Sequence, residues 1–267
     1  MKTRVVISYP RILAAFALLS ALLGLIIFLV RQLPDSATGW GVAFALGVVA
    51  LPVAASPWEW LVHRYVYHRV VIPFLRRIYE IHHKGHHGAI FPTWRYVTNG
   101  PVRRHPIGGA SVSELHTLGW RNATIKLGHF AFYFVLGSGV ICVPAWILTE
   151  SAPFLIGLYV SLVMVSDLFV RVHDAIHYPG LHPWIERQQW FRFLEVHHYI
   201  HHVDMEANVN FLLPLADWLF GTMRRTLTDE ELVRHGSLEE AKANPVGMSE
   251  PAIEVAHSRR HIPQPGA

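Results

Sequence analysis

Four long apolar stretches constrain the fold of this chain more than any other feature of its sequence. They cover residues 12–30, 38–58, 127–149 and 152–170. An α-helix needs about 20 apolar residues to cross the ~30 Å hydrocarbon core of a bilayer, and each stretch is about that long. Only 16% of the 267 residues are charged, whereas a soluble domain carries about 25%. The sequence therefore predicts an all-α integral membrane protein with four transmembrane helices.

The first apolar stretch follows three basic residues, Lys2, Arg4 and Arg11, so a cleaved signal peptide has to be considered. A signal peptide has a shorter apolar region and a small-residue cleavage site. We therefore expect a retained transmembrane helix. Short connections follow the first and the third stretch, so the four helices are expected to form two hairpins.

Histidines gather in four short motifs outside the apolar stretches. On an α-helix, at ~100° per residue, His198, His201 and His202 fall within a ~100° arc and form one ligand face, with His197 as a flanking residue. The same spacing recurs earlier, at His83, His86 and His87, where the role of His82 stays open. Two looser pairs, His63 with His68 and His173 with His177, complete the set. Neutral imidazole is the commonest metal ligand in proteins. The ten candidate metal ligands are His63, His68, His83, His86, His87, His173, His177, His198, His201 and His202.

This number of histidines predicts two metal ions. A closed structural zinc site needs four ligands, whereas ten histidines can serve two metals and leave open positions for a small molecule. The single cysteine, Cys142, excludes an intrachain disulfide and a Cys-rich zinc or iron–sulfur site. Histidine suits iron and zinc alike. Iron is favoured because activation of dioxygen requires a redox metal, and an apolar substrate beside such a centre indicates oxidation of an unactivated C–H bond.

The two hairpins decide on which side of the membrane the histidines lie. They place the N-terminus, residues 61–121 and everything after the fourth stretch on one side. The joining loops contain only Arg31, Asp35 and Glu150 as charged residues, and most Lys and Arg residues before the third stretch lie on the opposite side. Cytoplasmic loops carry an excess of Lys and Arg. Both termini and a helical cap that holds the dinuclear metal site are therefore predicted to be cytoplasmic.

Local motifs predict where several helices begin. Ser56, followed by proline and then by Glu59, is typical of a new helix with Ser56 as N-cap and Glu59 closing a capping box. Pro73 and Pro183 are each expected to begin a helix that carries a histidine motif. The fourth apolar stretch should continue as a helix as far as His177.

Other ionisable residues have simpler interpretations. A loose metal-buffering loop would have irregular histidine spacing and low-complexity surroundings, whereas these motifs lie among helix-forming apolar and aromatic residues. His129 and Asp167 lie in or beside apolar stretches, where an ionisable residue is a functional candidate by default. For Asp167, an ion pair with Arg171 one helical turn further on is the favoured interpretation.

The four histidine motifs, taken in order, resemble the four histidine boxes of the fatty acid hydroxylase superfamily. The closest pattern is that of the fatty acid 2-hydroxylases. The segment Asp217-Trp218-Leu219-Phe220-Gly221-Thr222 also resembles the family's sequence after the last box, and the resemblance covers about residues 56–222. The four motifs are His63 to His68, His83 to His87, His173 to His177 and His198 to His202.

The resemblance implies a membrane oxygenase that hydroxylates a lipid, such as a fatty acyl or sphingolipid chain, with O₂ and two electrons. It implies two iron ions, with zinc as an alternative in purified protein, and each of the ten histidines falls on a ligand position of the pattern. Some members carry a fused cytochrome b5 domain, for which too few residues precede the first apolar stretch here. We therefore expect a separate electron donor, such as cytochrome b5 or ferredoxin with its reductase.

Two other functions are left open. Sterol and carotenoid enzymes share related boxes, so a sterol or carotenoid hydroxylase or desaturase is the alternative among enzymes. A non-enzymatic metal-binding or transport protein is the alternative outside them, although a transporter should place ionisable residues at the bilayer midplane. Nucleic acid is not an expected partner, because no basic stripe is interleaved with aromatic residues.

Three regions are expected from these observations. Thr228 with Glu231, and Ser237 with Glu240, predict two short capped helices in the last region, and from residue 244 its composition predicts disorder. The regions are an N-terminal transmembrane hairpin (1–55), a hydroxylase catalytic region with the second hairpin and the histidine motifs (56–225), and a polar, partly disordered tail (226–267).

Overall fold

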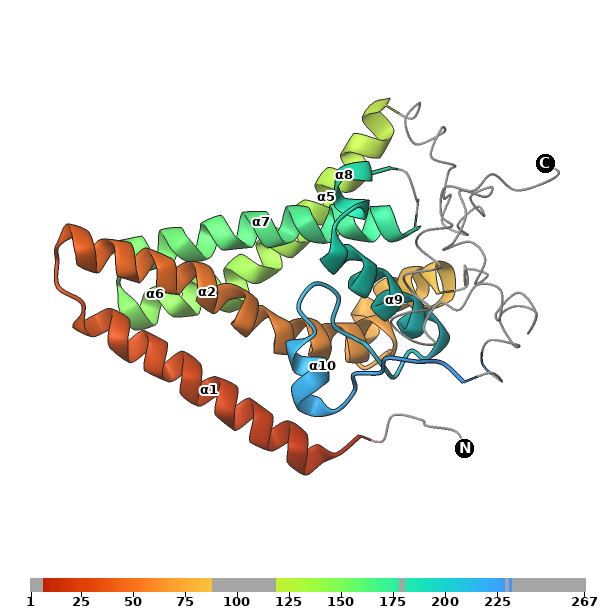
Figure 1. Cartoon of the computed structure of the whole chain (residues 1–267), viewed down its shortest axis with the longest axis horizontal. Coiled ribbons are helices and arrows are strands. Elements are labelled where there is room, and N and C mark those ends of the chain that lie inside the picture. The colour runs from red at the N-terminus through yellow and green to blue at the C-terminus, as the bar shows by residue number, and fades with distance from the viewer. Residues whose placement is uncertain (1–6, 88–118, 178–180, 229–230, 232–267) are drawn as a thin grey trace.

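The computed structural model describes residues 7–87, 119–177, 181–228 and 231. Within these residues every regular element is a helix (Figure 1). The expected all-α class and four helices apolar enough to cross a membrane are confirmed for this part of the chain. The four helical segments are Tyr9–Gln32, Ala37–Tyr67, Phe130–Thr149 and Ala152–His177.

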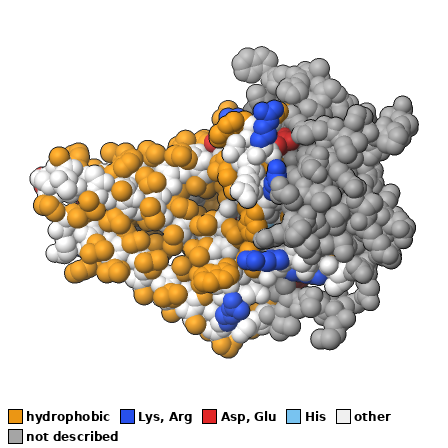
Figure 2. All heavy atoms as spheres, viewed as in Figure 1, with side chains coloured by type: hydrophobic (Ala, Val, Ile, Leu, Met, Phe, Trp, Pro, Cys, Tyr) orange, Lys and Arg blue, Asp and Glu red, His pale blue; other side chains and the backbone are white. Residues whose placement is uncertain are grey.

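Apolar side chains cover much of the surface of these helices. Figure 2 shows them over the elongated part of the molecule, with Lys and Arg side chains gathered towards one end. Val135 and Ile147, for example, are 69% and 68% exposed. Soluble monomers rarely expose large contiguous apolar patches. The helices therefore present a surface suited to lipid.

Helices α2 (Ala37–Val62) and α7 (Ala152–His177) form the centre of the bundle. A Cβ on Gly47 would lie 2.3 Å from a carbonyl oxygen of α7, and a Cβ on Gly157 would lie 2.2 Å from a carbonyl oxygen of α2. Small residues let the backbones of membrane helices approach each other closely. Because both helices lead into histidine motifs, this contact fixes the distance between those motifs.

The other apolar helices flank this central pair. Helix α1 (Tyr9–Gln32) is joined to α2 by a short turn, where the Ser36 hydroxyl caps α2 by accepting a hydrogen bond from Gly39 N–H (3.2 Å). The third apolar stretch forms α5 (Gly119–Gly137), a π-turn and α6 (Val143–Thr149) as one continuous helical path. The α1–α2 and α6–α7 turns lie at the same end of the molecule (Figure 1).

Helix α2 does not end at its prolines. The prediction that Ser56 caps a new helix and that Glu59 closes a capping box is wrong, because α2 continues to Val62. Proline removes a backbone donor and usually breaks a helix, but α2 is helical through both Pro52 and Pro57. The two polar side chains bind a later segment of the chain instead: Ser56 Oγ accepts from Ala216 N–H (3.0 Å) and Glu59 Oε1 from Phe211 N–H (2.8 Å).

The histidine motifs lie at the opposite end of the molecule from the two turns (Figure 1). The first two motifs are on π-turns, and the last two are on α-helices. A short helix begins at Pro73 and α7 reaches His177, as predicted. A helix also begins at Pro183, but it ends at Glu186 and does not carry the last motif, which lies on a separate helix that begins at Gln189. The elements of this end, besides α7, are η1 (His63–Tyr67), η2 (Pro73–Leu75), α3 (Arg76–Tyr79), η3 (Glu80–His86), α8 (Pro183–Glu186), α9 (Gln189–Val203) and α10 (Leu215–Phe220).

Helix α1 also packs against this end through α10. The Arg11 guanidinium donates from Nε to the backbone carbonyl of Leu219 (2.6 Å), and the rings of Phe16 and Phe220 stack at 5.1 Å. Gly221 ends α10 with a φ of +80°, in the left-handed region that favours glycine, and a Cβ there would lie 2.6 Å from the Arg11 guanidinium. The N-terminal helix therefore supports the segment that follows the last histidine motif.

Beyond α10, the chain makes one of the two predicted capping boxes. Thr228 N–H donates to Glu231 Oε2 (2.8 Å), and Glu231 N–H donates back to Thr228 Oγ1 (3.3 Å), which confirms this prediction. The Ser237 and Glu240 capping box and the expected disorder from residue 244 fall outside the described residues.

Candidate metal centre

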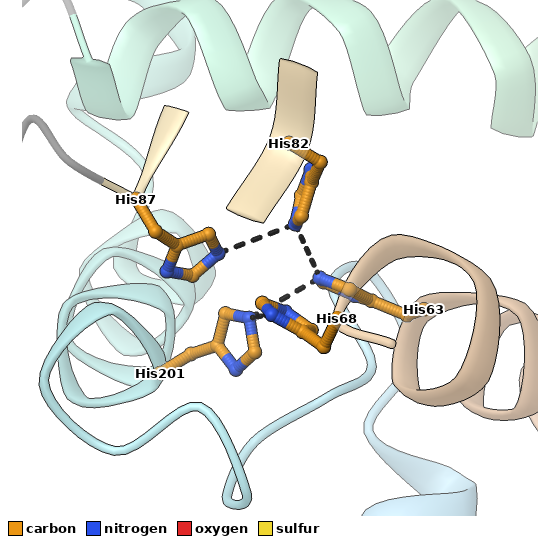
Figure 3. A group of neighbouring side chains, drawn as sticks. All are labelled: His63, His68, His82, His87 and His201. Atoms are coloured by element: carbon orange, nitrogen blue, oxygen red, sulfur yellow. Dashed lines mark hydrogen bonds between the residues drawn. The ribbon is translucent and has the colours of Figure 1, made fainter. Parts of the chain in front are cut away.

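Among the residues that the structure describes, nine histidines form two groups at the end of the molecule opposite the α1–α2 and α6–α7 turns. In each group, one ring nitrogen per residue lies within 4.8 Å of the corresponding nitrogens of the others. Figure 3 shows that the side chains of the larger group point toward one another from three separate parts of the chain. The five-histidine group consists of His63, His68, His82, His87 and His201, and the four-histidine group consists of His86, His177, His198 and His202.

Two π-turns build most of the five-histidine group. The backbone N–H of His68 donates to the carbonyl of His63 (3.1 Å), and that of His87 donates to the carbonyl of His82 (3.0 Å). On an α-helix, residues five apart are separated by ~140° around the axis, because each residue turns ~100°. The i→i+5 hydrogen bond of a π-turn instead brings the two members of each pair to one face. His201 of α9 completes the group.

The four-histidine group uses ordinary α-helical spacing. His198 and His202 are four residues apart on α9 and therefore share a face. Nε2 of His198 lies 3.1 Å from Nε2 of His202 and 3.0 Å from Nε2 of His177, at the end of α7. His86 joins from η3, with its Nε2 3.0 Å from Nε2 of His202.

Residues that are neighbours in the chain serve different groups. His86 belongs to the four-histidine group and His87 to the five-histidine group, and His202 and His201 divide in the same way. The rings of His87 and His202 stack with centroids 4.2 Å apart, so the two groups adjoin. The chain therefore brings two potential metal sites side by side.

The spacing of the ring nitrogens fits metal coordination. Nε2 of His63 lies 2.9 Å from Nε2 of His82 and 3.2 Å from Nε2 of His201. Four imidazoles bound to zinc at ~2.0–2.1 Å in a tetrahedron place their nitrogens ~3.3 Å apart. Lone pairs that face one another at such distances repel unless a cation or a proton lies between them. Each group could therefore hold a metal ion.

Burial favours the neutral form of an imidazole, which is the form that binds metals. Burial lowers the pKa of His201 to about 4, although the hydrogen bond to the Ala207 carbonyl acts in the opposite direction. Burial and then the charges of neighbouring imidazoles lower the pKa of five others well below the usual value, namely those of His68, His82, His87, His198 and His202.

Eight of the ten predicted ligands fall in the two groups, and two lie beside them. His83 places its Nδ1 3.1 Å from Nδ1 of His68, and its ring stacks on Tyr79 with centroids 4.9 Å apart. The ring centroid of His173 lies 4.4 Å from that of His177. Both residues therefore lie beside the groups, but neither is a member of the two sets of ring nitrogens that lie within 4.8 Å of one another.

His82 has a place in the five-histidine group that α-helical spacing did not assign to it. Its Nε2 lies 3.2 Å from Nε2 of His87. The sequence did contain a sign of this pairing, because His63 to His68 and His82 to His87 are the same interval of five residues. A repeated five-residue interval between potential ligands fits π-turns better than α-helices.

The remaining residues of interest have structural roles or fall outside the described residues. His197 lies outside both groups, and its Nε2 donates to the backbone carbonyl of Asn210 (2.9 Å). Asp167 pairs with Arg171 (2.7 Å), which confirms that interpretation. The side chain of His129 is not among those that the structure describes.

Comparisons of the chain with protein-family models, curated proteins and solved structures found no match. Its function is therefore inferred from the residues and their geometry. That geometry combines two adjoining groups that could each hold a metal ion with four helices suited to a bilayer.

Proposed function

We propose that the chain is a membrane-bound oxygenase of the fatty acid hydroxylase type, which hydroxylates a lipid at a centre of two metal ions. The substrate class is a fatty acyl or sphingolipid chain. In the reaction, a C–H bond of the lipid becomes C–OH with one oxygen atom of O₂. The other oxygen atom leaves as water, formed with two protons and with two electrons from a separate donor.

One observation carries this proposal: imidazoles converge in two adjoining groups at one end of four apolar helices. A single structural zinc site would explain only one group, because it needs four ligands. Iron bound there would supply the redox chemistry that dioxygen activation needs, and zinc suits the same ligands in purified protein. The buried imidazoles would hold the ions, and the apolar helices would guide a lipid chain toward them.

The same arrangement supports a membrane topology. The four helices would cross the bilayer as two hairpins, and the histidine-bearing segments would form a cap on the cytoplasmic side. The two turns lie at one end of the molecule and the histidine motifs at the other (Figure 1). Arg69 and Arg76, which lie between the first two histidine motifs in the chain, are exposed, and so is Arg11, which contacts α10. An excess of Lys and Arg favours the cytoplasmic side. A donor such as cytochrome b5, or ferredoxin with its reductase, would deliver electrons there.

The direct test is oxidation of lipid by the purified protein. The protein is loaded with iron(II) without oxygen, reconstituted in vesicles of a total lipid extract, and supplied with reduced ferredoxin and isotopically labelled O₂. We expect one labelled oxygen atom in a fatty acyl or sphingolipid chain. The variant His177→Ala, which lacks one nitrogen of the four-histidine group, should yield no labelled lipid.

The products separate the alternative functions. Loss of two hydrogens without incorporated label would indicate a desaturase, and label on a sterol or a carotenoid would change the substrate class. Accumulation of metal inside the vesicles without any oxidised lipid would refute the oxygenase and support a metal transporter.

A further inference from the structure

The segment that follows the last histidine motif lies against the five-histidine group. The carbonyl of Val209 accepts a hydrogen bond from Nδ1 of His63 (2.5 Å), and that of Ala207 accepts one from Nδ1 of His201 (2.8 Å). A carbonyl oxygen can only accept, so both imidazoles carry their proton on Nδ1 and leave the Nε2 lone pair for the group. The backbone at residues 207–209 therefore sets the tautomer and the direction of two potential ligands.

The carboxylate of Asp217 holds this backbone in place. It accepts hydrogen bonds from the N–H groups of Val209 (3.0 Å) and Asn210 (2.7 Å) and from the hydroxyl of Thr222 (2.6 Å). Nε2 of His197 lies 3.5 Å from the same carboxylate. Asp217 is completely buried, so no water competes for these bonds.

Asn210 attaches the same segment to helix α2. Its Nδ2 donates to the carbonyl of Ser56 (2.7 Å) and to the Glu59 carboxylate (3.2 Å), and its Oδ1 accepts from Asp217 N–H (3.0 Å). Helix α2 leads directly into η1 and His63. The network therefore fixes the position of the carbonyls relative to the histidine that they orient.

We propose that Asp217 is a positioning residue of the five-histidine group. By binding the N–H groups of Val209 and Asn210, it holds the Val209 carbonyl that directs Nε2 of His63 at the metal, and it steadies the segment whose Ala207 carbonyl directs His201. The inference rests on the metal-binding part of the proposed function. It concerns one of the two sites, because Asp217 reaches the ligands through these carbonyls.

The segment touches the four-histidine group by a different route. The ring of Phe211 packs against His198 with centroids 5.0 Å apart. The backbone N–H of Phe211 donates to Glu59 (2.8 Å) and not to Asp217. A change at Asp217 should therefore affect the two groups unequally, which makes the proposal testable.

The substitution Asp217→Asn keeps the shape of the side chain but replaces an acceptor oxygen by an NH₂ donor. Full-length protein without a His tag is loaded with zinc(II) in detergent, and the zinc retained is measured against increasing chelator. Wild-type protein should retain two zinc ions per chain. Asp217→Asn should bind one of them ~10–100-fold more weakly, the usual loss when a residue that orients a ligand is changed, and leave the other unchanged.

Two ligand variants identify the ion that is lost. His82→Ala weakens the five-histidine group, and His177→Ala weakens the four-histidine group. The double variant Asp217→Asn with His82→Ala should bind the second ion as tightly as His82→Ala alone does, because two changes that act on one site are not additive. The double variant Asp217→Asn with His177→Ala should bind both ions more weakly, because each change acts on a different group. Leu158→Ala, in the buried core between α2 and α7, is the structural control, which should lower the unfolding temperature and retain both ions.

Thr222→Val provides a milder variant if Asp217→Asn is too unstable to purify. It removes the hydroxyl that donates to Asp217 (2.6 Å) and that accepts from the Trp60 indole N–H (3.0 Å), and it should weaken the same ion by a smaller factor. Equal weakening of both ions in folded protein, or retention of both at wild-type strength, would overturn the positioning role and leave the proposed function intact. A wild-type protein that binds no zinc would overturn both.

Discussion

Nε2 of His82 lies 2.9 Å from Nε2 of His63, although 19 residues separate the two histidines in the chain. Each of them is the first residue of a π-turn, whose hydrogen bond joins His82 to His87 and His63 to His68. The five-histidine group is thus made of two pairs of the same construction, joined by His201. π-turns are rare and occur frequently at functional sites, so their presence in both pairs connects the backbone geometry to metal binding.

Replacement of His82 by alanine should lower the metal content more than replacement of His83. His82 contributes its Nε2 to the five-histidine group, whereas His83 stacks on Tyr79 beside it. We expect His82→Ala to lose one of two metal ions per chain and His83→Ala to retain both. Elemental analysis of protein purified without a His tag measures this. The opposite result would restore the α-helical interpretation, in which His83 is the ligand.

The two-hairpin topology predicts which positions react with a membrane-impermeant thiol reagent. In a Cys142→Ser background, single cysteines at Asp35 and Ser151 report on the turns. Cysteines at Arg76, between the second and third apolar helices, and at Arg225, after the fourth, report on the histidine-bearing end. We expect the first pair to label in intact cells and the second pair only after permeabilisation. Labelling of Arg76→Cys and Arg225→Cys from opposite sides would exclude a metal centre on one side of the membrane.

Gly47→Ala should destabilise the contact between α2 and α7. The added Cβ would lie 2.3 Å from a backbone oxygen of α7, and overpacking of this kind typically costs ~1–3 kcal/mol. Gly24→Ala is the matched control, because nothing lies within 4 Å of its Cβ. The control should be neutral or gain up to ~1 kcal/mol from its better helix propensity. Thermal unfolding in detergent compares the two, and equal unfolding temperatures would contradict the close approach.

The ion pair of Arg224 with Glu231 should make part of the stability depend on pH. Burial alone would raise the pKa of Glu231, but hydrogen bonds from Arg224 and Thr228 lower it from 4.5 to about 2. Because the unfolded chain takes up this proton at higher pH than the folded chain, the stabilisation is complete above pH 4.5 and is lost as the pH falls toward 2.

Glu231→Gln should therefore lower the unfolding temperature at neutral pH. The difference from wild type should shrink as the pH falls below about 4, where the unfolded chain is already protonated at this position. Unfolding followed by circular dichroism across this range measures the effect. A difference that stays constant with pH would show that Glu231 stabilises the fold by packing and not by its charge.

The sequence alone predicted the features that depend on short-range geometry. Four apolar helices follow from run length, because the thickness of a bilayer sets the length of a spanning helix. The chemical type of the site also follows from the sequence, since closely spaced imidazoles in four motifs indicate metal binding. The pairing of Thr228 with Glu231 and that of Asp167 with Arg171 were predictable for the same reason.

Features that depend on distant parts of the chain were not predictable in this way. The prolines of α2 suggested a helix boundary near Ser56, but the helix continues to Val62, and Ser56 and Glu59 bind a segment about 150 residues further along the chain. The assumption of α-helical periodicity favoured His83, whereas the π-turn placed His82 in the group. Local propensity was outweighed in both cases, because tertiary contacts determine which backbone geometry has the lower free energy.

Only the tertiary structure decided which histidines share a site. His86 and His87 are adjacent in the chain and serve different groups. His86 lies with His177 at the end of α7, whereas His87 lies with His63 and His68 of the first motif. The Val209 carbonyl that orients His63 lies 146 residues further along the chain. The backbone of Val209 is held in turn by Asp217 of α10. Residue type and spacing are local properties that the sequence contains. The direction of a lone pair depends on hydrogen bonds that exist only after the helices have packed.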